Sequence, residues 1–390
     1  MIEGIPTTSV LVLGLILLPI LLLPILLLPQ LKGWISNGKS SPGNLLPRLR
    51  LWSWGPKQSS EIISLWMYPI KSCRGFEVQQ ATLKEHGLAL DRRWMVIDSS
   101  KKNEFITIRQ NAKMTLIKTG LSDDGQELII SIPSPESESP STTKMNSIPI
   151  EKTYTTTIRI PAYPTQEWLQ ANTKIANVNI WGEDTDGYIY AENINAVFSS
   201  LLDRPVALVY KGPTARIVQG NGAPKVIGRV QTIGFPDEFP VLIASEASLK
   251  ELNTRLRVAN ADPITVERFR PNIVVKGQKA WSEDLWKLVR IRDADANPNS
   301  GAGLKNSPLV MDIVTRCGRC QVPNVDPDSA VKHKRQPWDT LMSYRRVDPG
   351  LKYKPCFGMM AAPRNEGVIE VGMRVEVLEE TTQHRYMSGL

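Results

Sequence analysis

The hydrophobic positions of this chain fall mostly in short runs separated by Gly, Pro, Asn, Asp and Ser. Runs of this length, rich in Val, Ile and aromatic residues, predict β-strands. In the first half the pattern predicts strands at residues 62–68, 94–97, 105–108, 128–132 and 178–181. A helix is predicted at residues 191–202, and the Ser, Pro and Glu residues of 133–149 predict a disordered loop inserted among the strands.

The second half continues the β-rich pattern with one amphipathic segment. Residues 245–256 place Leu249, Leu252 and Leu256 on one face, which predicts a helix. Strands are predicted at residues 241–244, 272–275, 288–291, 309–314, 368–371 and 375–378. Strands and helices do not alternate regularly, and neither a P-loop nor a dinucleotide fingerprint is present. The predicted fold class is therefore α+β and β-rich, with two barrel-like domains.

The most hydrophobic stretch, residues 10–29, is uncharged and almost entirely Leu, Ile, Val and Pro. About 20 helical residues, at about 1.5 Å each, span the roughly 30 Å core of a bilayer. Residues 1–9 contain Glu3 but no Lys or Arg, and no convincing cleavage site follows. An uncleaved transmembrane anchor at 1–30, followed by a linker at 31–60, is therefore favoured over a signal peptide. Positive charges follow the stretch, which predicts that the remainder faces the cytosol.

Composition narrows the possible partners. The length of 390 residues suits two domains plus a terminal segment. The net charge of +8 favours an anionic ligand, an anionic membrane or an acidic protein, unless it serves solubility alone. No nucleic-acid partner is expected, because no dense basic run with interleaved aromatic residues occurs. Four cysteines are too few for a disulfide framework, so reduced thiols, including a soft metal ligand, are expected.

Two basic clusters lie at the ends of predicted strands. Lys71 and Ser72 sit in a turn after the first strand, where an ammonium, a hydroxyl and backbone N–H groups suit a phosphate. Asp91, Arg92 and Arg93 precede the next strand, so one arginine can pair with the aspartate and the other with an anion. Taken alone, an ordinary basic turn and an exposed ion pair are the more common explanations.

A third cluster is Phe-Arg-Pro-Asn at 269–272. Pro271 predicts an extended Arg270, and Asn272 offers both a donor and an acceptor, which suits a polar heterocycle. Taken alone, this pattern is weakly specific.

The fourth cluster is Cys317-Gly318-Arg319-Cys320. A CxxC pair is typical of a redox dithiol or half a zinc site. No second CxxC is present, and the three histidines lack zinc-ligand spacing. We therefore expect one thiolate, Cys320, beside the guanidinium of Arg319, which can also bind an anionic cofactor, with Cys317 as packing.

These clusters together resemble one family. The segments YPIKSCRG, DRRWMVID, SEASLKELNTRL, FRPNIVV and CGRCQVPNVDPDSA occur in the order and spacing of MOSC proteins (molybdenum cofactor sulfurase C-terminal domain). Among these, the chain is similar to the mitochondrial amidoxime-reducing components. The resemblance implies a MOSC N-terminal β-barrel domain at 61–215 and a MOSC molybdenum-cofactor domain at 216–382. It also implies an anchor in the mitochondrial outer membrane, with the body facing the cytosol.

The resemblance further implies a molybdenum–molybdopterin cofactor and a set of residues that hold it. Cys320 is the implied metal ligand and catalytic residue. The implied cofactor-binding residues are Lys71, Ser72, Arg92, Asp237, Arg270, Asn272, Gly318, Arg319 and Cys320. The chain departs from the family pattern at 236–240, at 329–330 and at 359–360, which puts its substrate range in doubt.

The implied reaction is reduction of N-hydroxylated small molecules, such as amidoximes and hydroxylamines, to amidines and amines. The implied electron donors are cytochrome b5 and NADH-cytochrome b5 reductase, because no flavin, haem or iron–sulfur pattern is present. One alternative is a molybdenum-cofactor-binding or sulfur-carrier protein without reductase activity. Another is a membrane-tethered structural protein that has lost the cofactor.

Overall fold

Five short strands in the first half of the chain close into a barrel. The computed structural model describes residues 58–133, 155–294 and 307–389. The barrel strands are β5 (Trp94–Asp98), β6 (Glu104–Phe105), β10 (Thr173–Ile180), β11 (Glu183–Tyr190) and β12 (Val206–Lys211). A parallel pairing between β10 and β6 completes the ring. Met95, Ile97 and Val209 belong to the apolar cluster of these strands, which supplies the burial that short strands need.

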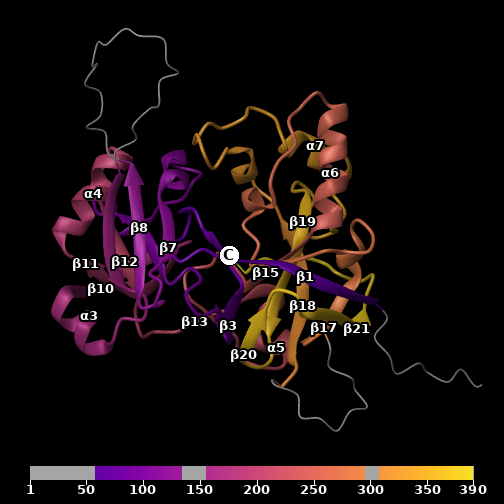
Figure 1. Cartoon of the computed structure of the whole chain (residues 1–390), viewed down its shortest axis with the longest axis horizontal. Helices are drawn as coiled ribbons and strands as arrows, with labels where there is room; N and C mark the ends of the chain where they lie inside the picture. Colours follow the sequence, from indigo (N-terminus) through magenta and orange to yellow (C-terminus); the bar gives the residue numbers. More distant parts are fainter. Residues whose placement is uncertain (1–57, 134–154, 295–306, 390) are drawn as a thin grey trace, which may run out of the picture. The chain divides into compact units, whose positions relative to one another are not determined.

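A second ring is built from strands that lie mostly in the second half. Its members are β1 (Gln58–Met67), β15 (Val241–Ser245), β16 (Ile273–Val275), β17 (Trp286–Arg292), β18 (Leu309–Gly318), β19 (Cys356–Pro363) and β21 (Arg374–Glu380). The antiparallel pairing of β1 with β16, for example Leu65 opposite Ile273, closes it. A strand from the start of the described chain thus completes the barrel of the second half (Figure 1).

Small sheets and helices surround the two rings. The small strands are β2 (Phe76–Val78), β3 (Gln80–Lys84), β4 (Gly87–Leu88), β7 (Lys118–Leu121), β8 (Glu127–Pro133), β9 (Thr155–Pro161), β13 (Arg216–Ile217), β14 (Thr232–Ile233) and β20 (Gly367–Glu370). The α-helices are α3 (Gln166–Asn172), α4 (Glu192–Leu202), α5 (Pro224–Ile227), α6 (Glu246–Val258) and α7 (Trp338–Tyr344). The helix α4 packs against β12, and α6 lies beside α7 (Figure 1).

One hydrophobic core joins the two halves. Trp94 of β5, Ile62 of β1 and Val275 of β16 belong to the same buried cluster. A shared core restrains the two halves relative to each other, because sliding one past the other would expose apolar surface. The pocket described below lies between segments of both halves and is held by this common packing.

The coarse fold prediction is confirmed: the described chain is β-rich, has two closed barrels and few helices. Several predicted strands differ in extent: those predicted to begin at 62 and 178 begin at Gln58 and Thr173. The stretch 105–108 is strand only at Glu104–Phe105, and the strand predicted at 309–314 continues to Gly318. The domain boundaries at 61, 215 and 382 stay predictions, and residues 133–149 lie almost entirely outside the described residues.

The predicted localisation requires correction. Within residues 58–133, 155–294 and 307–389, no helix is long and apolar enough to cross a membrane. This finding contradicts the prediction of a membrane-anchored protein of the mitochondrial outer membrane. The predicted anchor at 1–30 and most of the predicted linker at 31–60 lie outside the described residues.

Candidate functional site

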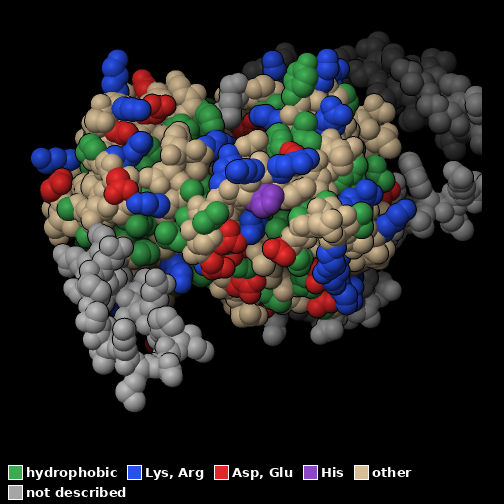
Figure 2. Space-filling view, turned by 90° about the horizontal axis from the view of Figure 1, so that it is seen from above, with side chains coloured by type: hydrophobic (Ala, Val, Ile, Leu, Met, Phe, Trp, Pro, Cys, Tyr) green, Lys and Arg blue, Asp and Glu red, His purple; other side chains and the backbone are tan. Residues whose placement is uncertain are grey.

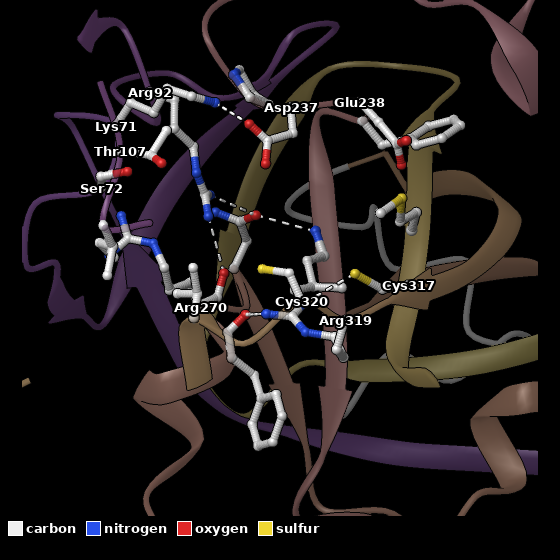
Figure 3. Close-up of a pocket in the computed structure, with 18 of the residues that line it drawn as sticks. Lys71, Ser72, Arg92, Thr107, Asp237, Glu238, Arg270, Cys317, Arg319 and Cys320 are labelled. Atoms are coloured by element: carbon white, nitrogen blue, oxygen red, sulfur yellow. Dashed lines mark hydrogen bonds and ion pairs between the residues drawn. The ribbon is translucent and has the colours of Figure 1, made fainter. Parts of the chain in front are cut away.

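A pocket forms where segments from both barrels meet (Figure 3). Its volume is about 150 Å³. Eight of the nine residues expected to hold a cofactor line it: Lys71, Ser72, Arg92, Asp237, Arg270, Asn272, Arg319 and Cys320. Gly318, the ninth, ends β18 and does not line the pocket. A β-carbon at Gly318 would lie 2.8 Å from Leu351, so close packing against this leucine favours a glycine here.

Lys71 and Ser72 come from the turn that follows β1. The backbone N–H of Lys71 donates to the Trp94 carbonyl at 2.8 Å, which ties this turn to β5. The Lys71 ammonium donates to the Phe235 carbonyl at 2.9 Å and to the Asp237 carboxylate. Burial lowers the pKa of Lys71 to about 8, although Asp237 opposes the shift. This lysine therefore sits near the balance between its charged and neutral forms, and a bound anion would favour the charged form.

Two arginines lie close to one buried phenol ring. The guanidinium carbons of Arg92 and Arg270 lie 4.8 and 4.3 Å from the Tyr68 ring centroid. Arg92 donates to Asp91 at 2.5 Å and to the Arg270 carbonyl at 3.0 Å. Asn272 accepts from Arg92 at 3.3 Å through Oδ1, which also accepts from the backbone N–H of Leu242. The expected clusters at 91–92 and 269–272 thus form one hydrogen-bonded group.

Arg270 is the least satisfied cation of this group. Its Nη1 donates to the Cys73 carbonyl at 2.7 Å, but its buried Nη2 has no hydrogen-bond partner among the described residues. Burial, followed by the nearby charge of Arg92, lowers the pKa of Arg270 to about 10. A buried guanidinium N–H without an acceptor is costly, so an anionic ligand at this point would stabilise it.

Three pocket residues hold unusual backbone conformations. Ser72, Arg92 and Arg270 have φ angles of +71°, +47° and +58°. Non-glycine residues in this region are strained and gather at functional sites. The prediction of an extended Arg270 is wrong: the residue adopts the left-handed conformation that ends the 3-10 helix η3 (Val266–Phe269). A following proline disfavours the right-handed helical conformation, so the left-handed conformation remained available to Arg270.

The two cysteines of the CxxC pair differ in environment. Cys317 is buried, and burial raises its pKa even though Arg319 opposes the shift. Cys320 is only partly buried and borders the pocket. Arg319 was expected beside Cys320, but its Nη1 donates to Sγ of Cys317 at 3.0 Å and its Nη2 to the Phe269 carbonyl at 3.0 Å. Its Nε is buried and has no partner among the described residues.

The cation next to Cys320 is Arg109, which sequence reasoning missed. Burial alone would lower the pKa of Arg109, but the sulfur of Cys320 and the Asp237 carboxylate outweigh it and raise that pKa. Arg109 stands between β6 and the 3-10 helix η1 (Ala112–Leu116) in a segment without a recognisable motif, 211 positions before Cys320. Only the meeting of the two halves brings them together.

Two carboxylates complete the pocket wall. Asp237 accepts from Lys71, from Arg109 at 3.4 Å and from Trp181 Nε1 at 3.0 Å. Burial opposes its ionisation, but these two cations outweigh it and hold the pKa of Asp237 well below its usual value. Glu238, a second residue that sequence reasoning missed, accepts from the Tyr386 hydroxyl, and burial raises its pKa.

This donor set fits an anionic cofactor that brings its own metal ligands. The pocket gathers five cations (Lys71, Arg92, Arg109, Arg270 and Arg319) against two carboxylates. Within the described part of the chain, no group of three or more His, Cys, Asp or Glu side chains could hold a metal ion. A metal at Cys320 would therefore need further ligands from a bound molecule, as a metal–dithiolene cofactor supplies.

Comparisons with known proteins cover both halves. The description "MOSC N-terminal beta barrel domain" matches residues 59–205, and "MOSC domain" matches residues 230–376. Mitochondrial amidoxime-reducing component 1 of Homo sapiens is 30% identical over 330 residues, covering 83% of this chain and 84% of that protein. The Mus musculus protein of the same name is 29% identical over 331 residues, covering 83% of each chain.

Two further comparisons extend the set. Mitochondrial amidoxime reducing component 2 of Rattus norvegicus is 29% identical over 337 residues, covering 81% of this chain and 82% of that protein. The crystal structure of the YUAD protein from Bacillus subtilis aligns with a TM-score of 0.31 at 8% identity, covering 82% of this chain and 95% of that one, and supports no conclusion. From the two domain matches and the relatives that span both domains, the chain belongs to the MOSC-domain family, in which it is similar to the mitochondrial amidoxime-reducing components.

Proposed function

We propose that this chain is a molybdenum-dependent oxidoreductase that reduces N-hydroxylated compounds, such as amidoximes and hydroxylamines, to amidines and amines. The family relation supports a function linked to the molybdenum cofactor, and the names of the relatives support a reducing activity on a small molecule. The observation that carries the proposal is the partly exposed thiol of Cys320 at a pocket that is also lined by two buried arginines, Arg270 and Arg319, each with one N–H that has no partner among the described residues.

In this proposal the chain's own residues bind and orient the cofactor. The thiolate of Cys320 is the protein ligand to the metal. Arg270 and Arg319 offer their unpartnered N–H groups to the anionic part, and Lys71 and Ser72 offer an ammonium and a hydroxyl to a phosphate. When bound, the cofactor supplies two-electron chemistry that removes the hydroxyl oxygen as water.

The reaction consumes two electrons and two protons for each N–OH group reduced to N–H and water. Burial raises the pKa of Glu238, so this pocket carboxyl keeps its proton at a higher pH than an exposed glutamate. It is the pocket's candidate proton donor. The electrons come from a partner protein, for which the family resemblance suggests cytochrome b5 and its NADH-dependent reductase.

The experiment that tests this function is a metal analysis of the full chain, produced in a host that makes the molybdenum cofactor. We expect about one molybdenum atom per chain, lost in Cys320→Ser. The matched control is Cys356→Ser, because Cys356 is buried on β19 and does not line the pocket. Circular dichroism verifies that each variant is folded.

The outcomes separate the competing functions. A folded protein without molybdenum, or equal molybdenum in the parent and Cys320→Ser, would contradict the proposal. Molybdenum that leaves during gel filtration, together with no reduction of any N-hydroxylated compound, would favour a cofactor carrier.

A further inference from the structure

A second cavity adjoins the cofactor pocket at Cys320. Its volume is about 430 Å³, which lies in the range of small-molecule sites, roughly 300–1,000 Å³. The two cavities share four lining residues: Ile108, Arg109, Cys320 and Val322. We call this second cavity the outer chamber. A molecule in the chamber would therefore lie against Cys320, which also borders the pocket.

The outer chamber differs from the pocket in its chemistry. Its apolar lining comes from Ile108, Ala112, Val322 and Val325, and the amides of Gln110 and Gln321 also border it. Its charged lining residues are Arg109 and Lys332, and no Asp or Glu of the described residues lines it. Arg270 and Arg319, each with one buried N–H that has no partner among the described residues, line the pocket and not the chamber. The groups that most need a tightly held anion are thus absent from the chamber.

Lys332 brings a positive charge that forms no ion pair within the described part of the chain. The residue is exposed, and its ammonium donates to the neutral Oε1 of Gln321 at 2.8 Å. Among residues 58–133, 155–294 and 307–389, no Asp or Glu forms an ion pair with it; Arg335, three positions later, pairs with Asp339. A ligand carboxylate near Lys332 would thus meet a cation that is free to pair.

We infer that the outer chamber is the substrate subsite, and that it takes N-hydroxylated compounds with an apolar body and an anionic group remote from the N–OH. This inference rests on the proposed function. The apolar walls would pack against the body, Lys332 would pair with the anionic group, and the N–OH end would point towards Cys320. Arg109, which borders both cavities, marks the boundary between the substrate and the cofactor.

The test uses two aromatic amidoximes that differ only by a para-carboxylate. Their affinities for the full-length, cofactor-loaded protein are measured by calorimetry without an electron donor, so binding is read apart from turnover. The molybdenum content of each sample is measured in parallel. Lys332→Ala removes the free cation, and Ala112→Phe fills the chamber at a residue that does not line the pocket. Lys334→Ala is the matched control, because Lys334 is exposed in the same basic run but does not line the chamber.

We expect the parent to bind the carboxylate compound more tightly than the neutral one. Lys332→Ala should lower the affinity for the carboxylate compound about fivefold, which is the upper range for an exposed ion pair, and leave the affinity for the neutral compound unchanged. Ala112→Phe should lower the affinity for both compounds, and Lys334→Ala should change neither affinity. The molybdenum content should be the same in all four proteins.

Two outcomes would overturn the inference, and a third would separate it from the proposed function. If Lys332→Ala binds the carboxylate compound as tightly as the parent, Lys332 does not pair with the anionic group. A loss of molybdenum in folded Ala112→Phe would assign the chamber to the cofactor. If the parent holds no molybdenum but binds the two compounds as expected, the chamber stands and the proposed reductase function fails.

Discussion

At the scale of single residues, the four thiols of this chain occupy two kinds of environment. Burial raises the pKa of Cys73 and Cys356 to about 12 and raises that of Cys317 as well. Cys320 alone is partly exposed and lies where the pocket and the outer chamber meet. The sequence motif is nearly symmetric, with cysteine at both ends, whereas the two thiols differ in what they can do.

Thiol labelling checks this difference. In cofactor-free native protein at pH 8, we expect a maleimide to label about one thiol per chain within minutes, at Cys320, because burial shields the other thiols and keeps them protonated. Unfolding in guanidinium chloride should expose all four cysteines. Peptide mass mapping identifies the site, and Cys320→Ser should abolish the fast phase. Fast labelling of Cys317 would contradict the assignment.

At the scale of elements, a buried carboxyl group connects α6 to a neighbouring 3-10 helix. Glu283 lies in the 3-10 helix η4 (Ser282–Leu285), is 1% exposed and accepts from the Ser248 hydroxyl of α6 at 2.5 Å. Its second oxygen has no partner among the described residues, and burial raises the pKa to about 7. The hydroxyl of Ser248 is therefore engaged with η4.

This acid makes stability depend on pH in a defined direction. The pKa is about 7 in the folded chain and about 4.3 in the unfolded chain, so the folded chain binds more protons between these values. Stability from this group is complete below pH 4 and is lost as pH rises through 7. The free energy of unfolding of the parent should fall between pH 5 and 8. In Glu283→Gln we expect this fall to be smaller by about 1–3 kcal/mol.

Urea unfolding at both pH values measures this change. Glu246→Gln, at a partly exposed position of α6, is the control and should follow the parent. An equal loss of stability in the parent and Glu283→Gln would show that Glu283 does not titrate in this window.

At the scale of the whole molecule, charge is the feature relevant to an electron donor. The chain carries a net charge of +8, and Lys and Arg side chains gather near the middle of the face drawn in Figure 2. An excess of positive charge speeds the encounter with an acidic protein and does so less as salt screens it.

Turnover with an acidic cytochrome donor should therefore fall with ionic strength. We expect kcat/KM for the cytochrome to drop about tenfold between 0.05 and 0.5 M salt, since steering of this kind is a rate effect. Steady-state assays at a saturating concentration of an aromatic amidoxime measure it. An uncharged small-molecule reductant is the control and should show little salt dependence. A salt-independent rate with the cytochrome would rule out charge steering by this chain.

The sequence by itself determined the β-rich pattern, the helix at α6 and the order of motifs that points to the MOSC family. These features follow from short-range rules, because alternation, turn residues and motif spacing are written along the chain. The resemblance also named eight residues that the structure gathers in one pocket, including Lys71, Arg270 and Cys320, although their roles stay predictions.

Only the tertiary structure decided which side chains face one another. It placed Arg109 rather than Arg319 beside Cys320, used β1 to close the second barrel and made two cavities meet at one thiol. Each of these depends on segments about 200 positions apart, whose contacts result from packing of a shared core and not from local pattern. That Lys332 forms no ion pair among the described residues is also a result of the tertiary structure, because only the folded chain shows which carboxylates lie within reach.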